Sequence, residues 1–174
     1  SDNAQHIDVI NHALKVIKDD FQISPTILVV VLANNPIIFK QWIKLSIDMI
    51  NQDSSITSVA PVYEYSDHSP FRSKEISQSG FLQSPLDLKA PSHLSTNRQS
   101  LPSTYFLCHN FWTLNTSNWG IDTIHTGDSP WTFMGRKTKP IVVPKSHDIH
   151  TLDDIIICEQ ILKWYSKDLG NVTG

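Results

Sequence analysis

Two side chains near the end of the chain have the types and the spacing to hold a metal ion. Asp148 and His150 flank Ile149 in a segment without helical periodicity. Residues two apart on an extended backbone point to the same side, so the carboxylate and the imidazole converge. Free N–H groups at the helix start expected after Thr151 favour an anion beside them. We expect an anion or a phosphate-bound metal complex here; a solvated pair beside an ordinary helix cap is the alternative.

Other patterns that carry chemistry are weak or missing. His147 and His150 are three apart, but no second ligand pair stands at zinc-site spacing. Cys108 and His109 are neighbours, and neighbours on a strand point to opposite faces, so we expect no thiolate pair. A serine-hydrolase Gly-x-Ser-x-Gly motif is absent. Gly80 is the first glycine, which excludes a glycine-rich phosphate loop from the first 79 residues.

Two arginines are candidates to bind an anionic ligand. Arg72 follows the segment His68-Ser69-Pro70-Phe71, and Arg98 begins the segment Arg98-Gln99-Ser100-Leu101-Pro102. The planar guanidinium group matches the geometry of a carboxylate or a phosphate. A solvated surface arginine is the alternative at each position.

The composition limits the class of protein. A chain of 174 residues is the size of one domain, so we expect a single domain over residues 1–174. Its 14 Lys plus Arg against 17 Asp plus Glu argue against binding to nucleic acid or to anionic membranes. The longest apolar run, 27–32, is far shorter than the roughly 18 residues of a membrane helix. Two cysteines, both in apolar stretches, favour reduced thiols and a cytoplasmic location.

Apolar periodicity predicts the elements that must position these residues. Apolar side chains recur at helical spacing between Ile7 and Ile17, and again between Phe39 and Ile50. The β-branched run 27–32 predicts a strand buried on both faces, as in the middle of a parallel sheet. Residues 56–63 predict a second strand, and Pro61 places it near an edge or a strand end. Strand, helix and strand in this order form a βαβ crossover, so the fold class is α/β.

The second half adds strands, a long excursion and a final helix. Residues 105–114 and 141–143 predict strands, and Thr151 stands three residues before Asp154, the spacing of a capping box. Residues 66–104 are rich in serine and proline and poor in apolar periodicity. Such a stretch is a surface loop, or an excursion that covers a site or reaches a partner subunit. Its length favours the second interpretation, and with it a homodimer.

In their order along the chain, six segments resemble the central and C-terminal parts of the acylneuraminate cytidylyltransferase family, the CMP-sialic acid synthetases. These segments are Asn11-His12-Ala13-Leu14, the loop 32–38, Thr57-Ser58-Val59, His68 to Arg72, Arg98 to Pro102, and Asp148-Ile149-His150-Thr151. The last is similar to the family's Asp-Ile-Asp-Thr signature. The resemblance covers most of the chain, which has no counterpart of the family's opening phosphate-binding strand and loop.

The resemblance implies a Rossmann-like nucleotidyltransferase sheet with helices on both faces. It implies an enzyme that transfers CMP from CTP to a sugar acid and releases pyrophosphate, with Asp148 as a catalytic, metal-binding residue. Because His150 replaces the family's second metal-binding aspartate, the divalent metal becomes manganese or magnesium, with manganese preferred. The implied substrate-binding residues are Arg72, Arg98, Asn34 and Asn35. The excursion would contact the second subunit of a homodimer. The alternative is a non-catalytic module for sugar-nucleotide binding or dimerisation.

Overall fold

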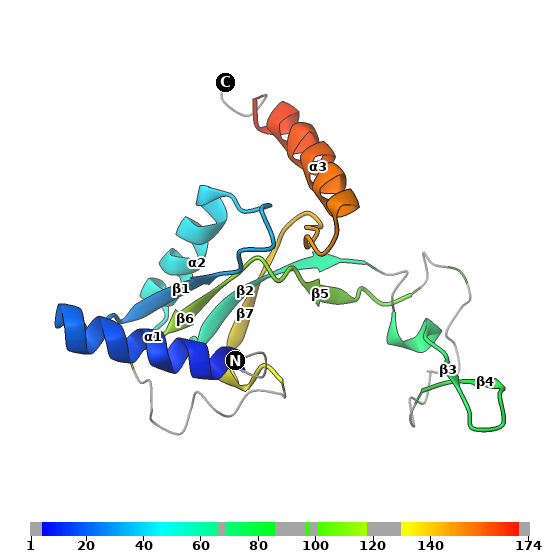
Figure 1. Ribbon diagram of the computed structural model, residues 1–174, viewed down its shortest axis with the longest axis horizontal. Coiled ribbons are helices and arrows are strands. Elements are labelled where there is room, and N and C mark those ends of the chain that lie inside the picture. Colours follow the sequence, from blue (N-terminus) through cyan, green and yellow to red (C-terminus); the bar gives the residue numbers. More distant parts are fainter. Residues whose placement is uncertain (1–4, 66–68, 86–96, 98–100, 118–129, 171–174) are drawn as a thin grey trace.

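The computed structural model describes residues 5–65, 69–85, 97, 101–117 and 130–170, and over these the protein has a mixed α/β fold (Figure 1). The three helices are α1 (His6–Phe21), α2 (Lys40–Gln52) and α3 (Leu152–Gly170). The five strands of the main sheet are β1 (Ile27–Val31), β2 (Ser58–Glu64), β5 (Tyr105–Leu107), β6 (Phe111–Asn115) and β7 (Thr138–Val142). A separate hairpin consists of β3 (Glu75–Ile76) and β4 (Leu82–Gln83).

The main sheet is mixed, with three strands pointing one way. β6 lies between β1 and β2 and is antiparallel to both, while β7 is parallel to β2. Strands β5 and β6 both lie on the side of β2 that is opposite β7. Val62 of β2 pairs with Leu107 of β5 on one side and with Val142 of β7 on the other. Consequently the carboxyl ends of β1, β2 and β7 all lie at the same end of the sheet. The predicted crossover from β1 through α2 to β2 is present, but β6 separates its two strands.

The prediction that 27–32 lies in the middle of a parallel sheet is wrong. Among the described residues β1 pairs only with β6, in antiparallel orientation, and Val31 is 53% exposed. Leu28 and Val30 pack against the cluster under α1, and Ile27 packs against the cluster under α2. The apolar run therefore reflects helices on both faces of the sheet. It carries no information about neighbours within the sheet plane.

The prediction that Pro61 marks an edge or a strand end is also wrong, because β2 has neighbours on both sides. The Pro61 carbonyl accepts a hydrogen bond from Cys108 N at 2.9 Å, so the ring nitrogen of Pro61 faces the same side. There the predicted strand 105–114 is interrupted between β5 and β6, and His109 has φ of 50°. The interruption accommodates a residue that has no N–H to donate.

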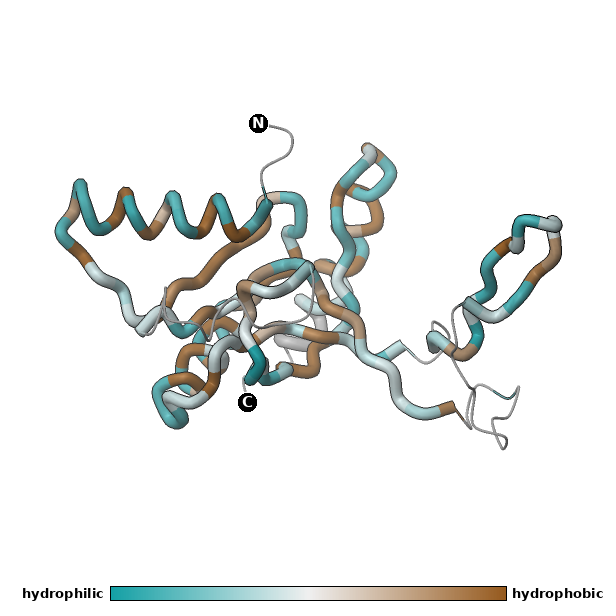
Figure 2. The backbone as a smooth tube through the Cα atoms, turned by 90° about the horizontal axis from the view of Figure 1, so that it is seen from below, coloured by the Kyte–Doolittle hydropathy of each residue, from teal (hydrophilic) through white to brown (hydrophobic). Residues whose placement is uncertain are grey.

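Helices cover both faces of the sheet, as expected. On one face Ile10 of α1 packs with Trp112, Leu114 and Phe133. Figure 2 shows hydrophilic and hydrophobic residues alternating within the turns of α1, as in an amphipathic helix. On the other face Ile50 of α2 packs with a cluster that includes strand residues of β2 and β7.

The last helix packs differently from the first two. Cys158 and Tyr165 of α3 form a third cluster with Ile37 and Phe39, which lie between β1 and α2. One of the two contacts of the predicted capping box is present, since the Asp154 carboxylate accepts the Thr151 N–H at 2.7 Å; the Thr151 hydroxyl donates to the same carboxylate at 2.9 Å. Over the described part of the chain, no helix is both long and apolar enough to cross a bilayer.

Candidate functional site

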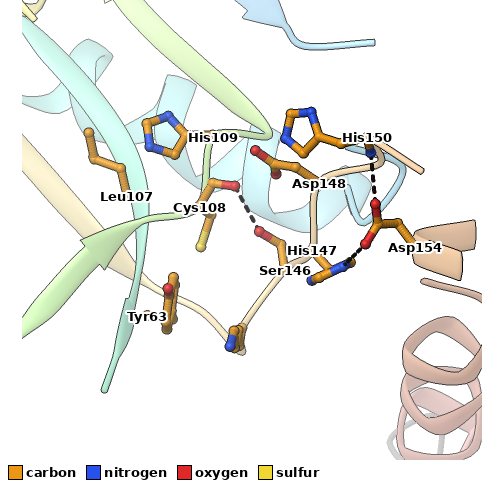
Figure 3. Close-up of a pocket in the computed structure, with 10 residues that line it drawn as sticks. Tyr63, Leu107, Cys108, His109, Ser146, His147, Asp148, His150 and Asp154 are labelled. Atoms are coloured by element: carbon orange, nitrogen blue, oxygen red, sulfur yellow. Dashed lines mark hydrogen bonds and ion pairs between the residues drawn. The ribbon is translucent and has the colours of Figure 1, made fainter. Parts of the chain in front are cut away.

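A pocket of about 250 Å³ lies where β1, β2 and β7 end (Figure 3). Its walls come from the end of β2, the interruption between β5 and β6, the segment after β7, and the first turn of α3. The lining residues are Tyr63, Leu107, Cys108, His109, Lys145, Ser146, His147, Asp148, His150 and Asp154. Open α/β sheets bind ligands at the carboxyl ends of their parallel strands, and this pocket has that position.

Asp148 is held in the pocket by Asn35, a residue 113 positions earlier. The Asn35 side-chain nitrogen lies 2.7 Å from Asp148 Oδ1, 2.8 Å from the Cys108 carbonyl and 3.1 Å from Ser146 Oγ. The side chain is 1% exposed, and its oxygen accepts the Ile37 N–H at 3.2 Å. Asn35 therefore positions Asp148 against the interrupted strand.

The neighbouring predicted residue, Asn34, acts through its backbone. Its carbonyl accepts a hydrogen bond from Ile149 N at 2.7 Å, which adds to the contacts of Asn35 between the loop after β1 and the segment before α3. The structure thus brings two of the resembling motifs, the 32–38 loop and the Asp148 signature, into direct contact. Whether either asparagine touches a substrate stays a prediction.

His150 lines the same pocket as Asp148, and its backbone is held by Asp154. One Asp154 oxygen accepts the His150 and Thr151 N–H groups at 3.0 and 2.7 Å, while the other lies 2.7 Å from His147 Nε2. The His147 hydrogen bond, followed by those from His150 and Thr151, holds the pKa of Asp154 well below its usual range. The charged carboxylate of Asp154 therefore fixes the backbone that carries the His150 ring.

Cys108 and His109 both line the pocket because the strand is interrupted there, so the opposite-face argument of the sequence does not hold at this point. Burial raises the pKa of the Cys108 thiol to about 11, and a protonated thiol is a poor nucleophile. Burial lowers the pKa of His109, with a smaller opposing effect of Asp148. The His109 ring packs 4.9 Å from the ring of Trp131.

Lys145, which lines the pocket, had no signal in the sequence. Lys145 extends its ammonium group over two tyrosine rings, with Nζ 4.9 Å from the ring centre of Tyr65 and 5.8 Å from that of Tyr63. Nothing in the sequence near Lys145 marks it as a ligand-binding residue, because its position depends on the pairing of β7 with β2. Only the aromatic alternation of Tyr63 and Tyr65 could have indicated a surface for a cation.

The donor set of the pocket suits a metal that arrives with other ligands. Among the side chains that the structure describes, no group of three or more His, Cys, Asp and Glu could hold a metal ion. Asp148 and His150 offer one oxygen site and one nitrogen site. Mg²⁺ bound with nucleotides commonly takes one or two carboxylates and completes its shell with phosphate oxygens and water. A metal held by Asp148 and His150 would need further ligands, such as phosphate oxygens and water.

Of the two predicted arginines, the structure describes only Arg72, and it does not bring Arg72 to the pocket of Asp148. Arg72 ends the 3₁₀ turn Pro70–Arg72 before the β3–β4 hairpin and is not among the residues that line the pocket. Arg98 lies outside the described residues.

No protein-family model matches this sequence, and no curated protein matches it.

Proposed function

We propose that the pocket binds a nucleotide and that the chain is a nucleotidyltransferase-type domain of the CMP-sugar synthetase kind. The reaction transfers CMP from CTP to a sugar acid and releases pyrophosphate. The observation that carries the proposal is the Asn35–Asp148 hydrogen bond at the carboxyl ends of β1, β2 and β7. It joins two motifs that resemble the same family at the place where α/β sheets bind ligands. The Rossmann-like form of the sheet is part of the same proposal.

Nucleotidyl transfer requires positioning and charge neutralisation and needs no covalent nucleophile. A divalent metal bound with the triphosphate supplies the neutralising charge. Asp148 offers a carboxylate whose orientation is set by the buried Asn35, and His150 offers an imidazole on the same pocket wall. The hydrogen bonds of Asp154 hold the His150 backbone. These residues are sufficient to orient a metal–nucleotide complex at one end of the pocket.

Calorimetric titration of Mn²⁺ and Mg²⁺ in the presence of CTP tests the proposal. The wild-type protein should prefer Mn²⁺, because an imidazole nitrogen replaces one carboxylate oxygen. His150→Asp should reverse the preference, and Asp148→Ala should abolish metal binding while circular dichroism stays unchanged. Asp153→Ala is the matched control, since Asp153 is exposed in the first turn of α3 and does not line the pocket.

Catalysis is tested separately by pyrophosphate release from CTP in the presence of N-acetylneuraminic acid. Release that depends on Asp148 supports the enzyme. Failure of the wild type to bind either metal with CTP would contradict the nucleotide site itself.

The second candidate is a non-catalytic sugar-nucleotide-binding or dimerisation module. One observation favours it: Lys145 is the only Lys or Arg among the described residues that line the pocket, which is little positive charge for a triphosphate. Metal-dependent CTP binding without pyrophosphate release would select this alternative.

A further inference from the structure

Lys145 is placed over its two tyrosines by the register of the sheet. Val62 of β2 pairs with Val142 of β7 in parallel orientation, so three residues further on Lys145 comes beside Tyr65. Tyr63 belongs to β2 and Tyr65 follows the last residue of that strand; residues two apart on an extended backbone point to the same side, and the two ring centres are 6.3 Å apart. An ammonium group over aromatic ring faces is held by the electrostatics of the rings.

No carboxylate among the described residues balances the charge of Lys145. Within the described part of the chain, Lys145 makes no ion pair, although Asp148 and Asp154 line the same pocket. Asp148 is hydrogen-bonded by Asn35, and Asp154 by His147. Both carboxylates are therefore oriented by other partners, while the contacts of the ammonium group within the described residues are aromatic.

The pocket consequently has two ends of opposite charge. In Figure 3 Tyr63 lies at one end and Asp148 and His150 lie at the other, with Cys108 and Ser146 between them. At the tyrosine end, the Tyr63 ring also packs against Phe106, with the two ring centres 5.8 Å apart. Burial, the largest cause, raises the pKa of Tyr63, so its hydroxyl group keeps a proton to donate at neutral pH.

We propose that Lys145, backed by the rings of Tyr63 and Tyr65, is a binding site for an oxyanion at the end of the pocket opposite Asp148. The ligand group is a carboxylate or a phosphate. Its identification rests on the proposed function, in which the candidates are the carboxylate of the sugar acid and the pyrophosphate product. The site orients a substrate whose reacting end lies toward Asp148. It also supplies within the pocket the anion contact that the sequence assigns to Arg72 and Arg98.

Calorimetry with three probes tests the site: N-acetylneuraminic acid, its methyl ester and inorganic pyrophosphate. One of the two anions should bind the wild-type protein, and Lys145→Met should weaken it about tenfold or more, the loss expected for one charged hydrogen bond. Lys145→Arg should retain most of the affinity. If the sugar acid is the ligand, its methyl ester should bind the wild-type protein as weakly as the acid binds Lys145→Met. If pyrophosphate is the ligand, the acid and its ester should not differ.

The tyrosine rings are tested through their effect on the lysine. Tyr65→Leu should weaken the same anion, whereas Tyr65→Phe, which keeps the ring, should bind as the wild type does. Lys139→Met is the matched control, because Lys139 is an exposed lysine in β7 that does not line the pocket. Unchanged anion affinity in Lys145→Met, or no binding of either anion to the wild type, would overturn the site.

The failure of this inference is distinguishable from that of the proposed function. If the sugar acid is the ligand, Lys145→Met should leave Mn²⁺–CTP binding at the Asp148 end in place; if pyrophosphate is the ligand, the same variant should also weaken Mn²⁺–CTP binding. Anion binding that depends on Lys145 in a protein that does not bind Mn²⁺–CTP would keep the oxyanion site and remove the nucleotidyltransferase. Mn²⁺–CTP binding in a protein whose anion affinity does not depend on Lys145 would keep the nucleotide site and remove the oxyanion site.

Discussion

At the scale of single residues, the candidate site depends most on an amide that is almost fully buried. Asn35 contacts the interrupted strand through the Cys108 carbonyl, and it contacts the segment after β7 through Ser146 and Asp148. Burying a polar side chain is favourable only when its groups are paired, and Asn35 meets that condition through partners far away in the sequence. Its contribution to function is therefore positioning.

Asn35→Ala should lower the free energy of unfolding by about 2–3 kcal/mol, because it leaves buried polar partners without their hydrogen bonds. Chemical denaturation monitored by tryptophan fluorescence gives the value. Asn34→Ala is the control: the contact of Asn34 with Ile149 is made by the backbone and survives the change. That variant should stay within about 0.5 kcal/mol of the wild type. Equal destabilisation by the two changes would contradict the assigned role of Asn35.

At the scale of elements, the start of α3 is where the fold and the site are coupled. Asp154 belongs to the first turn of the helix, and its carboxylate accepts hydrogen bonds from the backbone of the pocket segment before it. The helix start therefore holds the loop that carries Asp148 and His150. A change at this position should be visible in both stability and metal binding.

Asp154→Asn should lower the thermal stability at pH 7, with an effect that disappears in acid. The pKa of Asp154 in the folded protein is below its unfolded value of about 3.9. The stabilisation is therefore complete above the unfolded pKa and is lost as the pH falls through the lower folded pKa. Melting temperatures of both proteins at pH 7, 4, 3 and 2 give the comparison, at pH values chosen around the reference pKa.

Asp153→Asn serves as the control for that pH series, since Asp153 is exposed and lies in the same helical turn. A gap between wild type and Asp154→Asn that stays constant from pH 7 to the most acidic sample would contradict the hydrogen-bonded carboxylate.

At the scale of the whole molecule, the β3–β4 hairpin is set apart from the main sheet in both views (Figures 1 and 2). It presents three large apolar side chains, Ile76, Phe81 and Leu82, which are 74%, 73% and 74% exposed. A tight turn closes it, in which Gly80 has φ of 84°. Neighbouring apolar side chains this exposed are typical of an interaction surface, which supports the proposal that the excursion contacts a second subunit.

Phe81→Asp should convert a homodimer into a monomer, because it places a charge in the apolar contact. Light scattering over a range of protein concentrations measures the change. Val9→Asp is the control, since Val9 is also exposed, at 58%, but belongs to α1. A wild-type protein that is monomeric at every concentration would rule out the dimer, and an equal effect of both variants would rule out the hairpin as its contact.

Much of the local structure followed from the sequence alone. The apolar spacing of 7–17 and 39–50 correctly predicted α1 and α2, and Thr151 with Asp154 correctly predicted the start of α3. The alternation around Ile149 placed Asp148 and His150 together, and both line the pocket. These features depend on residues within one or two turns of each other, so the local spacing of side chains in the sequence is enough to predict them.

Tertiary structure decided the rest. The order of the strands, the edge position of β1 and the interruption opposite Pro61 depend on pairings between segments far apart in the chain. The same pairings bring Asn35 to Asp148 and Lys145 to the tyrosines, while Arg72 stays outside the pocket. Side-chain patterns report which faces of an element are covered, but not which strand lies beside it in the sheet. A pocket built at the ends of several strands is therefore determined only when the whole sheet is assembled.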